Sequence, residues 1–566
     1  MVSPAYHEAT KHDFGRFARA LGYLDWATQP DPFRRFAGAA LIDLPREPLA
    51  RDVTYDALYD GTAPSRPIGL PTIGEFLRCS MGLSAWKQYG ASRWPLRVNP
   101  SSGNLHPTET YVVWNGRVCH YAVREHALEI RSASREGSRR IKPSSELDPV
   151  VTPSDAARTF TVSESSFLVG LTSIYWREAW KYGERAFRYC QHDTGHAIGA
   201  LRLSAAMMGW RLALLPRWSH EDMASVLGVG RDEDFEGAER EDPECIAVVT
   251  AGDPAPFLDA NPALWVDAWR RAAWQGRASR VSPDHVDWPL IDEVAAATHD
   301  PGDQSRRCGA DLYGPRESRG PKGPGRHLAE SRVAARDIIL QRRSALAFDP
   351  GAPPLSREAF MSMLGRLQPG APPCDAMGWP PQVHLAIFVH RVEGLVPGLY
   401  AYLRDPAVLA EWKAAMRPEF LWERVNDRNG PNDPGDPNAP NVPNDLFLLV
   451  PIDCRQMAKR VSCDQDIAAD GFFGLGMIAR MEAPLREQGE WMYRRLFWEC
   501  GLIGQALYLE AEAAGARATG IGCYYDDPMH ELLGLTGHLW QSLYHFSMGT
   551  PIEDTRLTTE PGYSWE

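Results

Sequence analysis

The sequence predicts two tandem α+β domains that are copies of each other. When Gly183 is placed on Gly489, residues 183–228 align without a gap with residues 489–534. The residues that are identical in the two copies include Gly183, Glu184, Arg188, Gly195, Leu201, Leu203, Ala205, Gly209, Arg211, Met223, Leu227 and Gly228 of copy one. A match of this kind indicates an internal duplication. The alternation of short β-runs with helical stretches makes each copy α+β.

The duplicated segment predicts a long helix followed by a short strand in each copy. Apolar residues recur at helical spacing, and small residues occur where helices can approach closely. The expected helices span 185–210 and 493–515, the strands that follow them span 212–215 and 519–523, and earlier β-runs span 110–114 and 384–389.

The length of 566 residues accommodates two domains and a linker. We expect domain one over residues 1–297, a linker rich in Pro, Gly, Arg and Ser over 298–329, and domain two over 330–566. Within domain two, Pro and Gly recur too often over 426–445 for a helix or strand. This segment is interpreted as a surface loop, with an active-site lid as the alternative.

Composition excludes several classes of protein. The net charge of −13 disfavours a nucleic-acid partner, which requires a basic face. No apolar run is long enough to span a membrane, and the first residues show no secretion signal. The ten cysteines form no Cys-x-x-Cys pair and are expected to be mostly reduced core residues. These features predict a cytoplasmic protein.

Copy one carries a polar turn between two prolines, in the string PSSGNLHPTE over residues 100–109. Pro100 and Pro107 would make the turn rigid, while Ser101, Ser102 and Asn104 would supply hydrogen-bond donors to a flat ligand. The simpler interpretation is an ordinary turn that leads into the following strand.

Copy two opens with Arg342, Arg343 and Ser344, near the end of a helical run over 333–341. Two guanidiniums and a hydroxyl supply charge and donors for a phosphate. The alternative is a solvated basic helix end.

Copy two also contains Gly520-Ile521-Gly522 within its predicted strand, and Arg556 close to the last residue. Glycines there would expose backbone N–H groups and leave room for a planar ring. At the same positions copy one has Leu214-Leu215-Pro216, which would close such a gap. Close packing of the strand and a solvated cation are the simpler interpretations.

Together these pieces resemble the nitroreductase-fold flavoenzymes. That family combines an opening Arg-Arg-Ser-x-Arg-x-Phe, a Pro-Ser-Ser-x-Asn turn, a glycine-containing strand end and a C-terminal basic residue. The resemblance implies FMN bound at the interface of two subunits, with Arg342, Arg343, Ser344, Arg556, Gly520, Ile521 and Gly522 from one partner and Pro100, Ser101, Ser102 and Asn104 from the other. One departure is Leu346, which stands two places after Ser344, where the opening motif of the family has a further arginine.

Each copy holds the half of this pattern that the other lacks. In place of the Ser-Ser-Gly-Asn turn, copy two has PPCDAMG over residues 372–378, and copy one lacks the strand glycines. We therefore expect two tandem nitroreductase-like domains that form an intrachain pseudo-dimer, with one complete FMN site and one decayed site.

Copy one has a further motif, Lys181-Tyr182-Gly183-Glu184-Arg185, where copy two has Glu487 and Gln488 in place of the Lys-Tyr pair. The motif is similar to the Lys-Tyr-Gly-x-Arg signature of the azoline-oxidising (SagB-type) dehydrogenases of thiazole/oxazole-modified peptide pathways. This resemblance implies that Lys181 and Tyr182 are catalytic. A lysine that is partly desolvated beside a tyrosine is a reasonable base near neutral pH. The simpler interpretation is a surface lysine and a core tyrosine.

The predicted function is that of an FMN-dependent dehydrogenase or oxidase acting on a heterocycle, azoline to azole, or on a similar bond. Its substrate would be a small molecule or modified peptide, and its partners could include other biosynthetic enzymes. The alternatives are an NAD(P)H-dependent nitro or quinone reductase and a flavin-free binding scaffold. A metal site at Cys190, His192 and His196 is disfavoured, because copy two has Leu496, Trp498 and Leu502 there.

Overall fold

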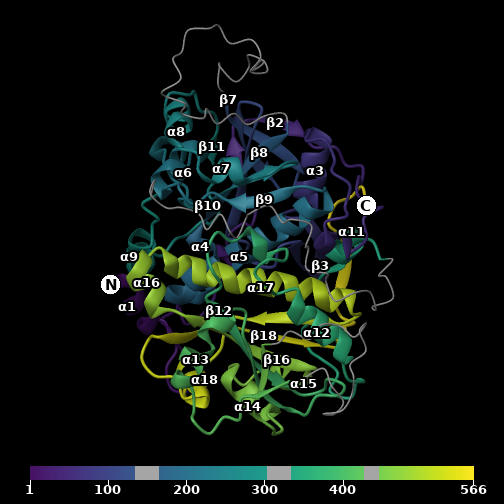
Figure 1. The fold of residues 1–566 in the computed structure, drawn as a ribbon. Coiled ribbons are helices and arrows are strands. Elements are labelled where there is room, and N and C mark those ends of the chain that lie inside the picture. Colours follow the sequence, from purple (N-terminus) through teal and green to yellow (C-terminus); the bar gives the residue numbers. More distant parts are fainter. Residues whose placement is uncertain (134–164, 303–332, 426–444) are drawn as a thin grey trace, which may run out of the picture.

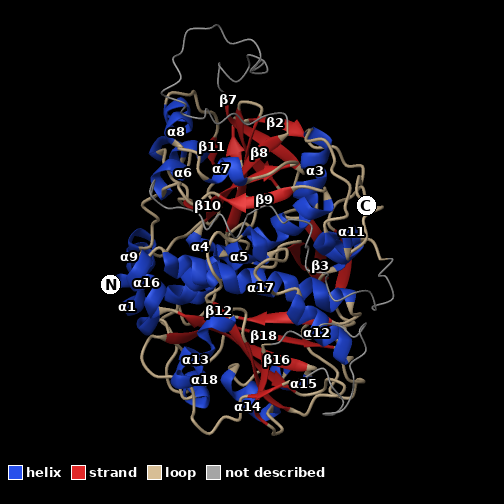
Figure 2. Ribbon diagram, viewed as in Figure 1, coloured by secondary structure: helices blue, strands red, loops and turns tan. Residues whose placement is uncertain are grey.

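In a computed structural model, the described residues are 1–133, 165–302, 333–425 and 445–566. Two seven-stranded antiparallel sheets lie on either side of a central helix pair, which consists of α5 (Ala186–Met207) and α17 (Met492–Ala513) (Figure 1). Figure 2 shows the resulting layers, with the helices between the strands of the two copies. The predicted tandem α+β architecture is confirmed.

The two sheets have equivalent strand orders. Copy one has the order β2 (Ala40–Asp43), β7 (Ala127–Ala133), β6 (Arg117–Ala122), β5 (Thr108–Trp114), β8 (Ser166–Ser173), β10 (Asp242–Thr250), β9 (Arg211–Leu214). Copy two has the order β14 (Glu423–Arg424), β15 (Leu446–Val450), β13 (Gly398–Tyr402), β12 (Val383–Val389), β16 (Phe473–Arg480), β18 (Trp540–Gly549), β17 (Arg517–Ile521). A small sheet joins β1 (Phe36–Ala37) to β11 (Arg277–Ala278).

Shorter helices surround the sheets. Those of copy one are α1 (Val2–Ala9), α2 (Ala57–Asp60), α3 (Leu70–Arg78), α4 (Tyr175–Tyr182), α6 (His220–Leu227), α7 (Ala255–Leu258), α8 (Ala263–Arg270) and α9 (Pro289–Ala297). Those of copy two are α11 (Ala335–Gln341), α12 (Arg357–Gly365), α13 (Leu409–Ala415), α14 (Arg455–Val461), α15 (Ile467–Asp470), α16 (Glu482–Gln488) and α18 (Asp526–Leu533). No helix of the described residues is long and apolar enough to cross a membrane.

Some residues are identical in the two copies because the backbone conformation requires them. Gly228 ends α6 with φ +74°, and Gly534 ends α18 with φ +82°. Only glycine adopts this left-handed C-cap without a steric cost, so the same residue is required at both helix ends.

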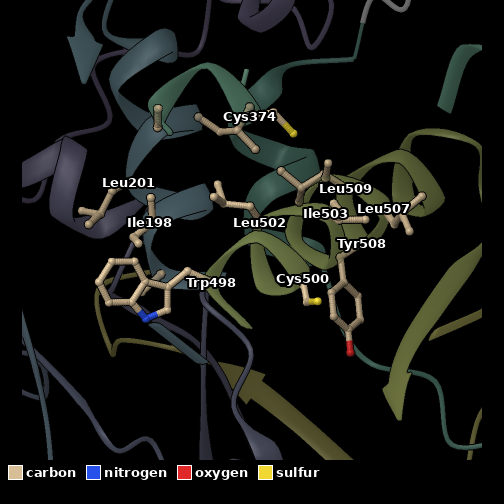
Figure 3. Packing of buried hydrophobic residues seen from close by; sticks show 14 of the residues in the cluster. Ile198, Leu201, Cys374, Trp498, Cys500, Leu502, Ile503, Leu507, Tyr508 and Leu509 are labelled. Atoms are coloured by element: carbon tan, nitrogen blue, oxygen red, sulfur yellow. The ribbon is translucent and has the colours of Figure 1, made fainter. Parts of the chain in front are cut away.

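The central helices cross at a matched pair of glycines. A Cβ on Gly195 would collide with the carbonyl oxygen of Trp498, and a Cβ on Gly501 would collide with that of His192. The two backbones therefore touch, and the side chains on either side of the crossing form one continuous apolar core (Figure 3). This core includes Ile198 and Leu201 of α5 and Leu502 of α17.

Both ends of the described chain pack against the opposite copy. The C-terminal strand β19 (Thr558–Pro561) pairs with β3 (Leu83–Tyr89), which also pairs with β4 (Ser92–Arg97). At the other end, His7 of α1 lies 3.0 Å from the hydroxyl of Tyr493 and 3.0 Å from Oε1 of Gln541. The N-terminal segment, which has no counterpart in copy two, thus holds the two copies together.

The predicted helices and strands of the duplicated segment are confirmed, with ends that differ by a few residues. The predicted β-runs at 110–114 and 384–389 correspond to β5 and β12, and the helical run that precedes Arg342 corresponds to α11. Residues 303–329 of the predicted linker and 426–444 of the predicted loop lie outside the described residues.

Candidate functional site

The polar turn of copy one and the Lys-Tyr pair are in direct contact. Gly103 has φ +63°, and a Cβ there would lie 2.8 Å from the Tyr182 hydroxyl and 3.0 Å from Nζ of Lys181. Glycine is therefore needed at this turn both for its backbone conformation and for the space above it. Lys181 also lies over the Tyr182 ring, with Nζ 5.1 Å from the ring centre.

Two buried carboxyl groups hold the turn in place. The Ser101 hydroxyl donates to Oε1 of Glu178 at 3.4 Å, and the Ser102 amide donates to Oδ1 of Asp193 at 3.2 Å. Pro100 before the turn is buried, while Asn104 closes it with φ +57°. Neither acid was predicted. The duplication could have pointed to Asp193, because copy two also has an acid, Glu499, at the matching position.

The electrostatics of this acid pair favour a bound proton. Burial raises the pKa of Asp193 to about 7, although hydrogen bonds from Ser101 and Ser102 oppose the shift. Burial, together with the charge of Asp193, raises the pKa of Glu178 well above its usual value. Burial and the Glu178 charge also raise the pKa of Tyr182, so its phenol stays protonated near neutral pH. The site thus combines a lysine amine, a neutral phenol and a carboxyl pair that can hold a proton.

Copy two meets this group through the end of β17. Arg185 donates to the Gly522 carbonyl at 3.4 Å and to Asp526 at 2.9 Å. The Tyr189 ring lies against Gly522 and packs on Tyr182 with a centroid separation of 4.4 Å. The lysine–tyrosine half and the glycine half, separated widely in sequence, therefore lie together at the interface between the copies.

The space beside the strand glycines differs from the sequence prediction. The Tyr544 hydroxyl and the Tyr189 ring occupy the volume that a Cβ would take at Gly520 and Gly522. The Gly520 amide donates to the Tyr508 hydroxyl at 2.8 Å, so this N–H is not free. Ile521 between them is buried in the core of copy two. In this structure these glycines permit close packing of aromatic residues.

The basic motif of copy two lies beside the polar turn. Arg342 is 3% exposed and donates to the Arg97 carbonyl, three residues before Pro100, at 3.0 Å. Its guanidinium lies 5.0 Å from the centre of the Tyr508 ring. Among the described residues its Nε has no hydrogen-bond partner and no carboxylate pairs with it. Burial consequently lowers the pKa of Arg342.

Arg343 and Ser344 extend the same cluster. Arg343 donates to the Ser84 carbonyl at 2.9 Å, and burial with the Arg342 charge lowers its pKa to about 10. The Ser344 hydroxyl lies 3.0 Å from that of Tyr508. Arg342 is buried and Arg343 is half-buried. The nearby Glu512 carboxylate accepts from the Arg343 amide at 2.9 Å and partly offsets the charge of both guanidiniums. This donor set fits a phosphate group.

Arg556 is not part of this cluster. Its side chain is 71% exposed, and it forms an ion pair with Asp554 at 2.8 Å. The guanidinium lies 5.7 Å from the centre of the Tyr89 ring, at the far end of β3 from Ser84. Leu346, the departure from the family motif, is exposed.

The equivalent position on the other side of the interface holds a small cavity. Leu214, Leu215 and Pro216 face Trp379, Trp491 and Trp498 around a cavity of about 30 Å³. Binding pockets for cofactors are on the order of 300–1,000 Å³. The cavity at this second position is thus smaller than a cofactor pocket, and on the first side aromatic rings likewise fill the space beside Gly520 and Gly522.

The histidine pair of α5 is held by hydrogen bonds. His192 lies 2.9 Å from the Leu543 carbonyl and stacks on Tyr544 at 4.1 Å. His196 lies 3.2 Å from the Tyr544 hydroxyl. Burial lowers the pKa of both imidazoles, so both are neutral and serve the packing of the interface.

Comparison with known proteins agrees with this architecture. The profile of the Nitroreductase family matches residues 66–238 and 339–550. The chain belongs to the nitroreductase family. No curated protein matches the chain. This nitroreductase-family chain is similar to a structure assigned as a nitroreductase from Anabaena variabilis, with 20% identity, a TM-score of 0.65, and coverage of 97% of this chain and 99% of that one.

Two further structures match single copies. A chain of the Escherichia coli microcin synthetase McbBCD complex has 16% identity and a TM-score of 0.27, and the match covers 38% of this chain and 70% of that one. An oxidoreductase containing FMN has 14% identity and a TM-score of 0.19, with 38% and 77% covered. The match to the Anabaena structure covers nearly the full length of both proteins, so the two proteins share the tandem fold.

Proposed function

We propose that this nitroreductase-family chain is an FMN-dependent dehydrogenase that converts an azoline to an azole, or oxidises a similar bond, in a peptide or small molecule. The observation that carries the proposal is the contact of Lys181 and Tyr182 with Gly103, at an interface where the basic motif of the other copy lies close by. FMN, when bound, would supply the hydride acceptor.

The chain's own residues divide into a phosphate end and a proton-transfer end. Arg342, Arg343 and Ser344 would hold the phosphate, since Nε of Arg342 has no hydrogen-bond partner among the described residues and the Ser344 hydroxyl lies in the same cluster. Ser101 and Ser102, fixed by the buried acids, would contact the flavin from copy one. This set supports one FMN per chain.

Lys181 and Tyr182 would handle the proton that azoline oxidation releases. Lys181 would take the proton at Nζ, while the neutral Tyr182 phenol would donate a hydrogen bond to the substrate. Glu178 lies one helical turn before Lys181 on α4, and its raised pKa lets it hold a proton. We propose that the Glu178–Asp193 pair receives this proton next.

The first test is the visible spectrum of the purified protein, with released flavin counted per chain. One FMN per chain is expected. A colourless protein that does not take up added FMN would favour a binding scaffold, and two FMN would contradict the proposal of a single site.

The second test separates dehydrogenase from reductase. Under anaerobic conditions, a thiazoline-containing peptide should bleach the flavin absorbance, whereas NAD(P)H should not. Rapid bleaching by NAD(P)H alone would instead favour a nitro or quinone reductase. A cytoplasmic location and association with other biosynthetic enzymes are part of the same proposal.

A further inference from the structure

A pair of cysteines lies directly beside the glycine strand. Cys523 follows Gly522, and its sulfur lies 2.9 Å from that of Cys463, in the loop after α14. Cys463 has φ +56°, a conformation that non-glycine residues rarely adopt. Both thiols are partly exposed, whereas the other cysteines of the described residues are buried. Copy one has Arg217 at the position of Cys523, so the pair occurs on one side of the interface.

The N-terminal segment adds a histidine to this pair. The His12 amide donates to Oδ2 of Asp526 at 2.9 Å, and the Asp526 amide donates to the His12 carbonyl at 2.9 Å. These reciprocal bonds hold Nδ1 of His12 at 3.9 Å from the Cys523 sulfur. The extra segment of copy one therefore completes a polar environment around a thiol of copy two.

The surroundings favour a thiolate at Cys523 and a thiol at Cys463. The hydrogen bond between the two sulfurs, helped by His12 and the charge of Arg185, lowers the pKa of Cys523 to about 5. The same hydrogen bond, with burial, raises the pKa of Cys463. An accessible thiolate beside a second thiol is the arrangement used in thiol–disulfide exchange.

We propose that Cys463 and Cys523 form a redox-active dithiol whose oxidant is a low-molecular-weight disulfide. Cys523 attacks one sulfur of the small disulfide, whose S–S bond breaks and releases one small thiolate, which takes up a proton. Cys463 then loses its proton and attacks the Cys523 sulfur, which releases the second small thiol. The protein loses two hydrogens and the small disulfide gains them, so the exchange balances.

This proposal is independent of the flavin chemistry, but its location has a consequence. The disulfide would join the loop after α14 to the strand end whose Gly522 carbonyl accepts from Arg185. Gln465 of the same loop already donates to the Cys523 carbonyl at 3.0 Å. This hydrogen bond holds the two segments close enough for a covalent link.

The test uses the full-length protein with oxidised glutathione, followed by digestion without reduction and mass spectrometry. Wild type should give a Cys463–Cys523 cross-link that retains no glutathione and that dithiothreitol reverses. In C463S, the resolving thiol is absent, so glutathione should remain on Cys523. In C523S, neither product should form on the same timescale. Buried Cys454 and Cys500 serve as internal controls and should stay unmodified.

Three results would overturn the proposal. The first is a wild-type protein in which glutathione stays on Cys523 without a cross-link, and the second is one in which both thiols remain free. The third is a tightly bound zinc ion that must be chelated before either thiol reacts, which would make Cys463, Cys523 and His12 a metal site. If C463S does not fold, the wild-type cross-link and C463A decide the question.

Discussion

At the scale of single residues, the two copies share some side-chain roles and differ in others. Lys181 faces Gly103 of the polar turn, whereas its counterpart Glu487 lies exposed at the end of α16. Asp193 accepts from the turn amide of Ser102, and its counterpart Glu499 accepts from the Gln382 amide at 3.0 Å. The acid on the central helix thus supports a loop in both copies, while the lysine occurs only beside the polar turn.

The Lys181→Met substitution tests the proposed base. Loss of a positioned acid–base group lowers turnover by about 10²–10⁴-fold. Flavin content should stay at the wild-type level, because the proposal assigns the phosphate to Arg342, Arg343 and Ser344 and not to Lys181. The measurement is the rate of flavin bleaching by an azoline peptide. Glu487→Met, the matched change in copy two, should leave the rate unchanged; equal effects of the two substitutions would contradict the assignment.

The Arg342→Ala substitution tests the phosphate site. A hydrogen bond to a charged group contributes about 1.5–3 kcal/mol, so the Kd for FMN should rise on the order of 10- to 100-fold. The flavin-free protein should keep its Tm or gain stability, because the substitution removes a buried charge that has no carboxylate partner among the described residues. Titration with FMN measures the first effect. Exposed Arg486, paired with Glu482, provides the control as Arg486→Ala.

The Asp193→Asn substitution tests the buried acid pair through pH. Its folded-state pKa of about 7 lies above that of the unfolded chain, which is about 3.9. Between these values the folded protein holds a proton that the unfolded chain has lost, so stability falls as pH rises from about 4 to about 7. The variant cannot lose this proton, and its free energy of unfolding should depend less on pH in this window.

Urea unfolding at about pH 4.5 and about pH 7.5 measures the difference, which should be a few kcal/mol at about 1.4 kcal/mol per pKa unit. Because the pKa of Glu178 is also raised, part of the pH dependence of the free energy of unfolding should remain in the variant. Asp267→Asn, at an exposed position, should retain the wild-type slope. An Asp193→Asn slope identical to that of wild type would contradict the buried proton.

At the scale of elements, periodicity and the duplication predicted the central helices and their strands, because burial of one face leaves a regular pattern in each copy. They could not predict which residues fill the space beside Gly520 and Gly522, since Tyr189 and Tyr544 come from other elements. The role of Glu178 was also hidden, because its copy-two position is Pro484 and offers no comparison. Arg556 matched a family motif, but its partner is the local Asp554.

The crossing of α5 and α17 gives a prediction for these elements. Gly501→Ala adds a methyl group that meets backbone atoms of His192 and Gly195, which cannot rotate away. Overpacking of this kind costs about 1–3 kcal/mol, and a backbone collision belongs at the upper end. The urea midpoint should fall accordingly. Gly365→Ala, at a helical glycine with open space around it, should instead stabilise by up to about 1 kcal/mol. A neutral Gly501→Ala would show that the helices can separate without cost.

At the scale of the whole molecule, the duplication has produced two copies that depend on each other. Every residue of α5 is buried, and α17 is buried over nearly its full length. The first helix packs on copy two and the last strand pairs with copy one, so each copy carries a piece of the other's surface. The two sides of the interface can therefore differ within one chain, and one side alone holds the lysine, the turn and the basic motif.

This interdependence predicts the behaviour of the separated copies. Residues 1–302 and 333–566, expressed alone, should each fail to form a compact monomer, because the apolar faces of α5 and α17 would be exposed to water. Expressed together, the two fragments should associate into a species of the size of the intact chain and bind FMN, since the site needs residues from both. Size-exclusion chromatography and the urea transition of each sample measure this. A fragment that unfolds cooperatively as a monomer, with the midpoint of the intact chain, would show that its copy is an independent domain and that the interface contributes little to its stability.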